Sequence, residues 1–532
     1  MKPGRRLLFL TPTIILAFAL FGGIYGSGQT GVAAATSDND VDASIRTFTY
    51  VYSVVEHNFA DPLDPDKAIY RGAVPGMLRT LDPHSTFFDP RDYQLLKEDQ
   101  KGHYYGVGMK VGPRNNKTLI MEIFTGSPAY KAGLRPGDII VNVGGKSTEG
   151  LSTTEVADLL KGPRGTRVTV TVVRQGHDKP LEFQVTRDEI SRKSVPEAYF
   201  IRPGIAYMRI LQFQETTSRE VEDAFEKLGE NNVKGLILDL RGNPGGLLSE
   251  GVAVAGRFLQ KGQTIVKHRG RASAERPYVA RQGNNSRDYP IVVLVDRRSA
   301  SAAEIVAGAL QDHDRAWILG DTTFGKGLVQ TVYPLSDNTG LALTTAKYYT
   351  PSGRLIQRDY SSMSFFDYYF RKKTDTKNSQ DIRMTDTGRT VYGGGGIAPD
   401  EKFLPPKLNR FQAEMMRNVR ELIFNFTSKY FGTHSSKLPK NWEPDEAVLN
   451  EFHQFLLDNG TRFTEAEFAE NRDWLLIQLK REMYAYAFSV DEANRLDVET
   501  DPVVARAIES LPKARALLES AKRWMAQRAA AQ

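Results

Sequence analysis

Residues 235–246 read Gly-Leu-Ile-Leu-Asp-Leu-Arg-Gly-Asn-Pro-Gly-Gly, and this stretch decides the fold. Its first half is an apolar run of strand length, and its glycine-rich second half is typical of a loop. Two more apolar runs lie at 291–295 and 317–320, and helical runs follow the first two strands at 247–259 and 301–311. Strands that alternate with helices predict an α/β core with a parallel sheet.

Three loops after these strands carry polar or small residues. The first ends in Gly245 and Gly246, the second carries Ser299-Ala300-Ser301, and the third carries Lys326. Parallel strands joined by right-handed crossovers have their carboxyl ends at one edge of the sheet, where ligands bind. We therefore expect the three loops to meet in one site.

Ser301 stands at the start of a predicted helix, so the backbone amides of the first helical turn point toward its side chain. The amide of Ala302 is one natural donor to an oxyanion. Gly245 or Gly246, which has no side chain to block a close approach, supplies a second donor. The spacing of Ser301 and Glu304 is also that of a capping box, so a plain helix cap stays an open alternative.

A lysine is a better base for Ser301 than a histidine. His313 lies twelve residues further on, and a helix of that length separates the two by about 18 Å. The polar cluster 312–314 is instead typical of a helix end. Lys326 lies between two glycines, and its amine can take the serine proton once burial or a helix N-terminus lowers its pKa. Gln330 can hold that amine by a hydrogen bond without adding charge.

Between 101 and 188 the pattern changes to short strands separated by glycines, with one helix near 153–160. The strands are expected at 106–111, 119–124, 138–143, 167–174 and 181–186. The motifs that resemble PDZ domains are Gly-Val-Gly-Met at 106–109, Ser-Pro-Ala at 127–129 and Gly-Leu-Arg-Pro-Gly-Asp-Ile-Ile at 133–140. The resemblance implies a module that binds a protein C-terminus as an added strand. Its implied carboxylate-binding residues are Tyr105, Gly106, Val107 and Gly108.

The chain as a whole resembles the carboxyl-terminal processing proteases, a family of PDZ-containing serine peptidases. Four motifs carry the resemblance, and they lie at 238–246, 299–305, 325–330 and 392–400. The family uses the second Ser of Ser-Ala-Ser as nucleophile, a Lys 25 residues later as general base, and a Gln four residues further as its support. These roles fall on Ser301, Lys326 and Gln330.

The resemblance implies a serine endopeptidase that cleaves proteins near or from their C-termini and selects them through the PDZ domain. The implied fold is multidomain α/β, with a crotonase-like protease core and an inserted PDZ domain, and no metal or organic cofactor is needed. Two features depart from the family pattern. Lys161 stands where many relatives carry Arg at the end of the PDZ helix, and the polar stretch 371–381 is typical of an exposed loop insertion.

The two ends of the chain have their own patterns. Three basic residues precede 19 apolar residues from Leu7 to Tyr25 and small residues up to Ala35, which is the layout of a signal peptide, although 19 residues also suffice for an uncleaved anchor. Either case places the mature chain in the periplasm or at the outer face of the inner membrane. The expected units are 1–35 signal or anchor, 36–98 helical N-terminal region, 99–188 PDZ domain, 189–400 protease core and 401–532 helical C-terminal region.

Composition narrows the partners. A net charge of +6 over 532 residues gives no basic stripe of the kind that binds nucleic acid, and the absence of Cys excludes disulfides and thiolate chemistry. We expect protein substrates with free C-terminal tails and a homo-oligomer formed through the helical terminal regions; an activating adaptor stays open. A noncatalytic PDZ scaffold and an acyl-thioester enzyme are the alternative functions. The intact Ser301, Lys326 and Gln330 set argues against the scaffold, and the acyl-thioester enzyme has no evident use for a PDZ domain.

Overall fold

A computed structural model describes residues 38–530 apart from 115, 175, 362, 371–380 and 436. The predicted signal or anchor at 1–35, and nearly all of the predicted loop insertion at 371–381, lie outside the described residues. Two compact units divide the chain, Met1–Gly76 and Met77–Gln532. Within the described ranges, no helix combines the length and the apolar character needed to cross a membrane.

The described residues of the first unit, from 38 onward, form helices. They are α2 (Asp38–Asn58), α3 (Pro65–Ala68), a π-helical turn (Ile69–Ala73) and the start of α4 (Val74–Arg79). The apolar face predicted on α2 is present, but Ile45, Phe48, Val55 and the following Phe59 are all exposed. Within the part of the chain that the structure describes, this helix therefore has an exposed apolar face.

The core of the second unit is a six-stranded sheet in the order β10-β11-β12-β15-β16-β21. Its strands are β10 (Glu197–Arg202), β11 (Ile205–Arg209), β12 (Gly235–Asp239), β15 (Ile291–Val295), β16 (Trp317–Gly320) and β21 (Glu401–Lys402). All neighbours are parallel except β10 and β11. The three predicted apolar runs are thus adjacent parallel strands, and every residue of β12 and β15 is buried.

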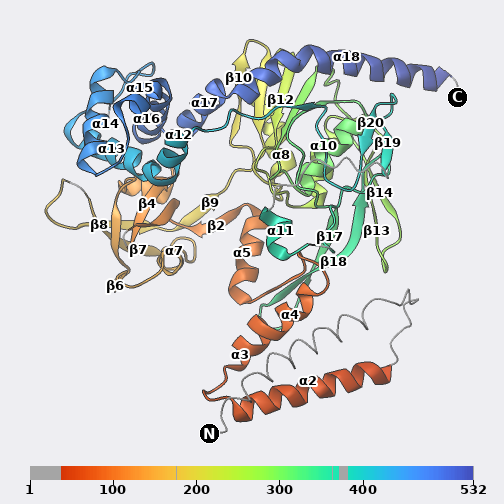
Figure 1. Ribbon diagram of the computed structural model, residues 1–532, viewed down its shortest axis with the longest axis horizontal. Coiled ribbons are helices and arrows are strands. Elements are labelled where there is room, and N and C mark those ends of the chain that lie inside the picture. Colours follow the sequence, from red (N-terminus) through yellow and green to blue (C-terminus); the bar gives the residue numbers. More distant parts are fainter. Residues whose placement is uncertain are drawn as a thin grey trace, which may run out of the picture. The chain divides into compact units, whose positions relative to one another are not determined.

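Helices cover both faces of this sheet (Figure 1). One face packs against α8 (Thr217–Leu228), α9 (Leu248–Gly256) and α10 (Ala302–Asp312). The other face, which includes Tyr207, Ile237 and Leu294, packs against the end of α17 (Val490–Thr500) and α18 (Pro502–Ala530). The last helix of the chain is therefore part of the core sandwich.

A second sheet carries the strand that follows Lys326. It consists of β1 (Thr86–Phe88), β18 (Gly340–Tyr349), β13 (Thr264–Arg269) and β14 (Arg276–Val279), with β17 (Leu328–Pro334) paired to β18. Strands β1 and β17 pair with opposite edges of β18, and the loop before β1 crosses toward β17, where the Gln330 side chain donates to the His84 carbonyl. Residues 82–85 thereby reach the neighbourhood of Gln330.

Residues 103–191 form the predicted PDZ fold. Its strands are β3 (Met109–Arg114), β4 (Lys117–Ile123), β5 (Ile139–Val143), β6 (Lys146–Ser147), β7 (Arg167–Val173) and β8 (Leu181–Thr186), and its helices are α6 (Pro128–Ala132) and α7 (Thr153–Leu160). A separate pair, β2 (His103–Gly106) and β9 (Asp188–Ser191), joins the two ends of the module. The order β3-β4-β5-β7-β8 leaves β3 at an edge of the sheet.

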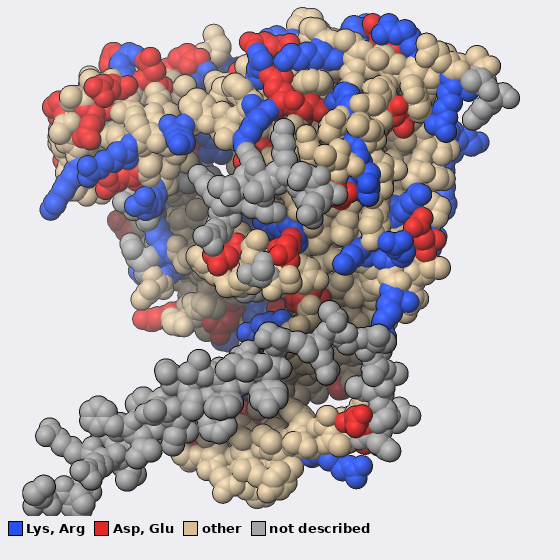
Figure 2. Space-filling model, turned by 45° about the vertical axis from the view of Figure 1, so that its right-hand side comes forward, with Lys and Arg blue, Asp and Glu red and all other residues tan. Residues whose placement is uncertain are grey.

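The remaining helices lie in the C-terminal region, before the PDZ fold and after β18. The predicted C-terminal helices are α12 (Arg410–Glu414), α13 (Arg420–Thr433), α14 (Glu446–Asp458), α15 (Glu465–Glu470) and α16 (Arg472–Ala487), with their own apolar core. Helix α5 (Pro90–Lys101) precedes the PDZ fold, and α11 (Phe365–Phe370) follows β18. On the described part of the face in Figure 2, Lys and Arg alternate with Asp and Glu, so charge of one sign forms no continuous stripe there.

The packing of α18 on the sheet predicts a large effect of a single truncation. Leu511 is buried, and a Cβ placed on Gly235 of β12 would lie 3.3 Å from both of its methyl groups. We expect Leu511→Ala to lower the free energy of unfolding by about 2–4 kcal/mol, because the sheet backbone cannot collapse into the gap. Thermal unfolding measures the effect. Arg515→Ala, an exposed change on the same helix, is the control, and equal melting temperatures of the two variants would contradict the packing role.

Candidate active site

Ser301 lies between β15 and α10 in a strained backbone conformation. Its φ is +54°, a value that non-glycine residues rarely adopt, and it stands at the N-cap of α10. Every residue of α10 is buried, so the helix that follows Ser301 is firmly anchored. By contrast, the Ser299 hydroxyl donates to the Leu240 carbonyl at 2.8 Å inside the core. Ser301 is thus partly exposed, whereas Ser299 is buried.

The glycine-rich loop after β12 lies directly against Ser301. A Cβ on Gly245 would lie 2.6 Å from the Ser301 Cβ and 3.0 Å from the Ala302 nitrogen, and a Cβ on Gly246 would collide with the Phe213 carbonyl oxygen at 2.1 Å. Only glycine fits at either position. This close approach is the reason for the Gly-Gly pair.

The predicted oxyanion donors differ in whether their N–H groups are free. The Gly245 N–H donates to the Asn243 side-chain oxygen at 2.8 Å, in a buried position. The N–H groups of Ala302 and Gly246 have no acceptor among the residues that the structure describes. Of the three predicted donors, Ala302 and Gly246 are therefore free to bind an oxygen atom, and Gly245 is engaged.

Lys326 lies in the loop before β17, and its amine donates to the Gln330 side-chain oxygen at 2.9 Å, as predicted for this pair. Burial lowers the pKa of the Lys326 amine, while the negative charges of Glu304 and Asp82 oppose that shift. The other end of the Gln330 amide donates to the His84 carbonyl. The side chains of Ser301 and Lys326 make no hydrogen bond with each other in the described structure.

Glu304 joins the Ser301 loop to the Lys326 loop. One of its carboxylate oxygens accepts the N–H groups of Ser301 and Lys326, both at 2.8 Å, and the other accepts the Gly325 N–H at 2.7 Å and the Thr323 hydroxyl. Glu304 is fully buried, and this burial raises its pKa even though the hydrogen bonds act in the other direction. The capping-box bond predicted from Ser301 to Glu304 exists, but it is only one of four.

The sequence argument missed this role of Glu304, since it treated the residue as a cap alone. A signal was available, because a carboxylate between Ala303 and Ile305 in an otherwise apolar helix is rarely buried without several partners. Tyr348 was also missed. Its buried hydroxyl lies 3.1 Å from the Ser301 carbonyl oxygen and within hydrogen-bond distance of the Lys326 carbonyl oxygen, which ties the same two loops a second time.

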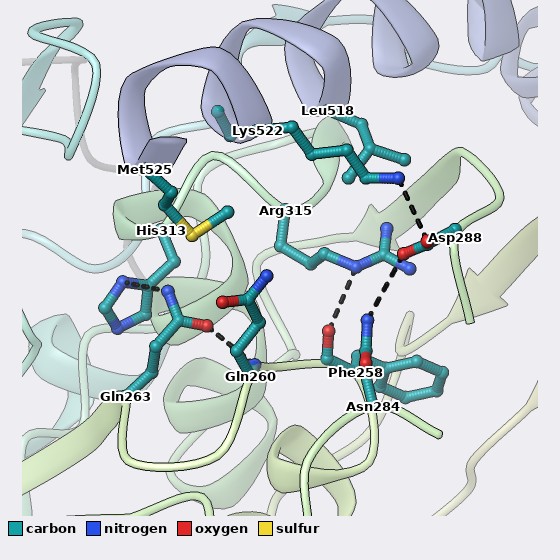
Figure 3. A pocket seen from close by; sticks show the side chains of 11 residues that line it. Phe258, Gln260, Gln263, Asn284, Asp288, His313, Arg315, Leu518, Lys522 and Met525 are labelled. Carbon is teal, nitrogen blue, oxygen red and sulfur yellow. Dashed lines mark hydrogen bonds and ion pairs between the residues drawn. The ribbon is translucent and has the colours of Figure 1, made fainter. Parts of the chain in front are cut away.

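His313 lies at the end of α10, as the helix-end prediction required. Its ring nitrogens lie 2.7 Å from the Asp386 carboxylate and from the Thr264 carbonyl oxygen. Burial alone would lower the pKa of His313, but these two acceptors raise it. Figure 3 shows the ring beside Gln263 at a cavity of about 20 Å³ under α18, and the residues that line this cavity include none of the site loops.

In the PDZ fold, the predicted tail-binding residues span the end of β2 and the turn before β3. The carbonyl oxygens of Val107 and Gly108 point into the fold, where they accept from Ala129 (2.8 Å) and Phe124 (3.1 Å). Their N–H groups have no acceptor within the described part of the chain. Tyr105 and Gly106 belong to β2 and pair with β9. Two adjacent amides are thus unpaired at the edge of β3.

Lys161, the departure noted at the end of the PDZ helix, makes an ion pair with Glu98 of α5. The distance is 2.7 Å, and both side chains are largely buried. The Lys161 amine also lies 5.3 Å from the centre of the Tyr104 ring. A single ammonium group therefore connects the PDZ helix to α5, in place of a two-pronged guanidinium contact.

Comparison with known proteins shows which protein families this chain is similar to. Residues 204–361 match peptidase family S41, and residues 119–174 match the PDZ domain family. A carboxy-terminal-processing protease of Bartonella bacilliformis is 43% identical over 360 residues, which cover 66% of this chain and 80% of that protein. A carboxyl-terminal-processing protease of Synechocystis is 41% identical over 292 residues, 54% of this chain and 68% of its own. Among solved structures, a photosystem II D1 C-terminal processing protease is 28% identical and covers 67% of this chain and 86% of its own, with a TM-score of 0.35.

These matches define a serine-type peptidase with a PDZ domain. The chain belongs to the carboxyl-terminal processing protease family, within peptidase family S41.

The contacts of Glu304 predict that its carboxylate cannot be replaced by an amide. In Glu304→Gln one oxygen becomes an NH₂ group, so buried N–H groups of the two loops lose their acceptor. We expect the rate of peptide cleavage to fall at least about tenfold and the melting temperature to fall as well. Glu155→Gln is the matched control, because Glu155 holds the same helix position in α7 but is exposed. Wild-type turnover by Glu304→Gln would contradict the joining role.

Proposed function

We propose that this protein is a serine endopeptidase that cleaves proteins near or from their C-termini with a Ser301/Lys326 dyad. The observation that carries the proposal is the convergence of three loops. Glu304 holds the loops of Ser301 and Lys326 together, and Gly245 packs against Ser301. A nucleophile, a partly buried amine and free amides thereby share one edge of the sheet.

The chemistry is acyl transfer in two stages. The neutral Lys326 amine takes the proton of the Ser301 hydroxyl as its oxygen attacks a peptide carbonyl, and the resulting ammonium returns that proton to the leaving amine. Water, activated in the same way, then hydrolyses the acyl-enzyme. The lowered pKa of Lys326 supports this role, because it raises the fraction of amine that is neutral near pH 7. Catalytic hydrogen bonds are often long in substrate-free enzymes, so we expect the distance between the Ser301 hydroxyl and the Lys326 amine to shorten when substrate binds.

The oxyanion of the tetrahedral intermediate would be held by the N–H groups of Ala302 and Gly246. Both are free, and Ala302 also lies at the positive end of the α10 dipole. Gly245 serves this arrangement by allowing the loop to approach Ser301, while its own N–H orients the Asn243 side chain. Gln330 accepts a hydrogen bond from the amine without charge, whereas a carboxylate there would raise the pKa of Lys326.

The PDZ domain would select the substrate by its tail. A C-terminal peptide can extend the sheet at the edge of β3, with its carboxylate on the free amides of Val107 and Gly108, flanked by Tyr105 and Gly106. A noncatalytic scaffold would need only this module, and it would not explain why Glu304 connects the loop of Ser301 to the loop of the partly buried Lys326 amine. An acyl-thioester enzyme gives no reason for the PDZ module.

We further infer a crotonase-like core, export through the N-terminal segment, and action in the periplasm or at the outer face of the inner membrane. Among the described residues, α2 exposes apolar side chains that include Ile45 and Phe48, and these support a homo-oligomer formed through a terminal helical region. An activating adaptor is compatible with this arrangement.

The dyad predicts a severe loss of activity for a conservative change at either of its two residues. Ser301→Ala should reduce cleavage by about a thousandfold or more, and Lys326→Arg should be nearly as inactive as Lys326→Ala, because a guanidinium keeps its proton. Cleavage of an unfolded protein is measured across pH, and the wild-type rate should rise on the alkaline side as the amine loses its proton.

Ser299→Ala is the matched control for this experiment. Its hydroxyl bonds to the Leu240 carbonyl in the core, so we expect a smaller loss of activity. Robust cleavage by Lys326→Arg would rule out the dyad.

The free amides of the PDZ domain predict that a substrate with a free apolar C-terminus is cleaved faster than the same polypeptide amidated at that end. Amidation removes the charge that Val107 and Gly108 would bind, and a charge-assisted hydrogen bond contributes roughly 1.5–3 kcal/mol, or about tenfold or more in rate. The difference should appear at low substrate concentration if the module only tethers, and also at saturation if docking switches the site. Equal cleavage at every concentration would show that the domain does not read the terminus.

A further inference from the structure

Lys326 belongs to a closed ring of hydrogen bonds that extends well beyond Gln330. The amine donates to Gln330, whose NH₂ group donates to the His84 carbonyl. The His84 ring lies 2.8 Å from the Tyr368 hydroxyl through Nε2. Gln357 donates to the same hydroxyl at 3.1 Å and accepts from the N–H of Gly327, the residue after Lys326, at 2.8 Å. Four separate segments of the chain thus meet around the amine.

The donors and acceptors around His84 are all satisfied when its imidazole is neutral. The Tyr369 hydroxyl donates to the Pro83 carbonyl at 3.0 Å, so toward His84 Nδ1, at 3.2 Å, it accepts. The Tyr368 hydroxyl accepts from Gln357 through one lone pair, which leaves its own proton to be donated to Nε2. In this arrangement the imidazole carries its proton on Nδ1.

The surroundings of His84 favour that neutral state. Burial, together with the positive charges of Lys326 and Arg358, lowers the pKa of His84 to about 4, although Asp82 opposes the shift. The Asp82 carboxylate also accepts the His84 N–H at 2.7 Å and so holds the loop from within. The closed ring of hydrogen bonds is therefore intact near neutral pH, where Lys326 has to act.

This geometry fixes which end of Gln330 faces the amine. A carbonyl oxygen can only accept, so the His84 carbonyl binds the NH₂ group of Gln330 and leaves Oε1 for Lys326. A rotation of the amide by 180° would place two donors against each other. The position of His84 thereby keeps an acceptor on the amine.

Helix α11, which supplies Tyr368 to this network, follows the range 204–361 that matches the peptidase family. Tyr368 is 1% exposed and packs edge-on against Phe324, two residues before Lys326, at 5.6 Å between ring centres. The Arg358 guanidinium covers both rings, at 3.7 and 4.3 Å from their centres. Phe366, on the same helix, is 67% exposed. One face of α11 thus packs on the loop of the base.

We propose that Tyr368 is a positioning residue for the base: its hydroxyl closes the ring through His84 and Gln357, holds the Gln330 oxygen on the Lys326 amine and keeps water from that amine. The proposal rests on the dyad proposed above. The charged or titratable groups near the Lys326 amine are Glu304, Asp82 and His84. Those near the His84 side chain are Asp82, Lys326, Arg358, Tyr368 and Tyr369.

Tyr368→Phe tests the hydroxyl while the ring packing stays. We expect kcat at pH 7 to fall about tenfold with KM unchanged, and the alkaline rise of the rate to move to higher pH, because a hydrated amine recovers a higher pKa. His84→Ala, which keeps the backbone carbonyl, should show the same shift. The double variant should lose little more than either single one, since both changes break one ring.

Phe366→Ala is the matched control on the same helix, and it should leave kcat and the pH profile unchanged. A Tyr368→Phe enzyme with the wild-type profile, or with an equal loss at every pH that tracks a lower melting temperature, overturns the proposal. Lys326→Arg is measured in parallel. Activity there refutes the dyad itself, whereas an inactive Lys326→Arg with an unshifted Tyr368→Phe refutes only the role of Tyr368.

Discussion

The proposed active site depends on one buried carboxylate. Glu304 accepts hydrogen bonds from the backbone of the Ser301 loop and from that of the Lys326 loop. A buried charge without partners would be strongly unfavourable, so these donors are what make its burial possible. The same contacts couple the two loops, because a displacement of either one would leave the carboxylate short of a partner. Ser301 and Lys326 are therefore held as a pair.

Around this carboxylate the molecule combines a rigid frame with a strained residue. The φ of +54° at Ser301 is unfavourable by itself, and it persists because α10 is buried along its whole length and Gly245 leaves no room to relax. Lys326 is held differently, through side-chain amides and a loop that precedes β1. Ser301 is thus positioned by its backbone and by packing, and the Lys326 amine by a polar network.

Much of this could be predicted from the sequence. Strands 291–295 and 317–320 were located to the residue because they are buried on both faces, and the parallel-sheet rule then brought Ser301 and Lys326 to one edge. Other features depend on contacts that no local pattern records. Whether Gly245 or Gly246 has a free N–H depends on the side chain of Asn243. The contact of Gln330 is with a backbone carbonyl 246 positions away, which any residue type could supply.

The packing of α18 has a consequence for the order of events during synthesis. The strands of the central sheet are complete by residue 402, yet one of their faces is covered by a helix that begins at Pro502. Until that helix has been made, Tyr207, Ile237 and Leu294 have no partner layer. A nascent chain would therefore already contain Ser301 and Lys326 while the sheet that aligns them is covered on only one face. Stable alignment of the proposed dyad, and with it any capacity to cut neighbouring chains, would be delayed until the protein is almost finished.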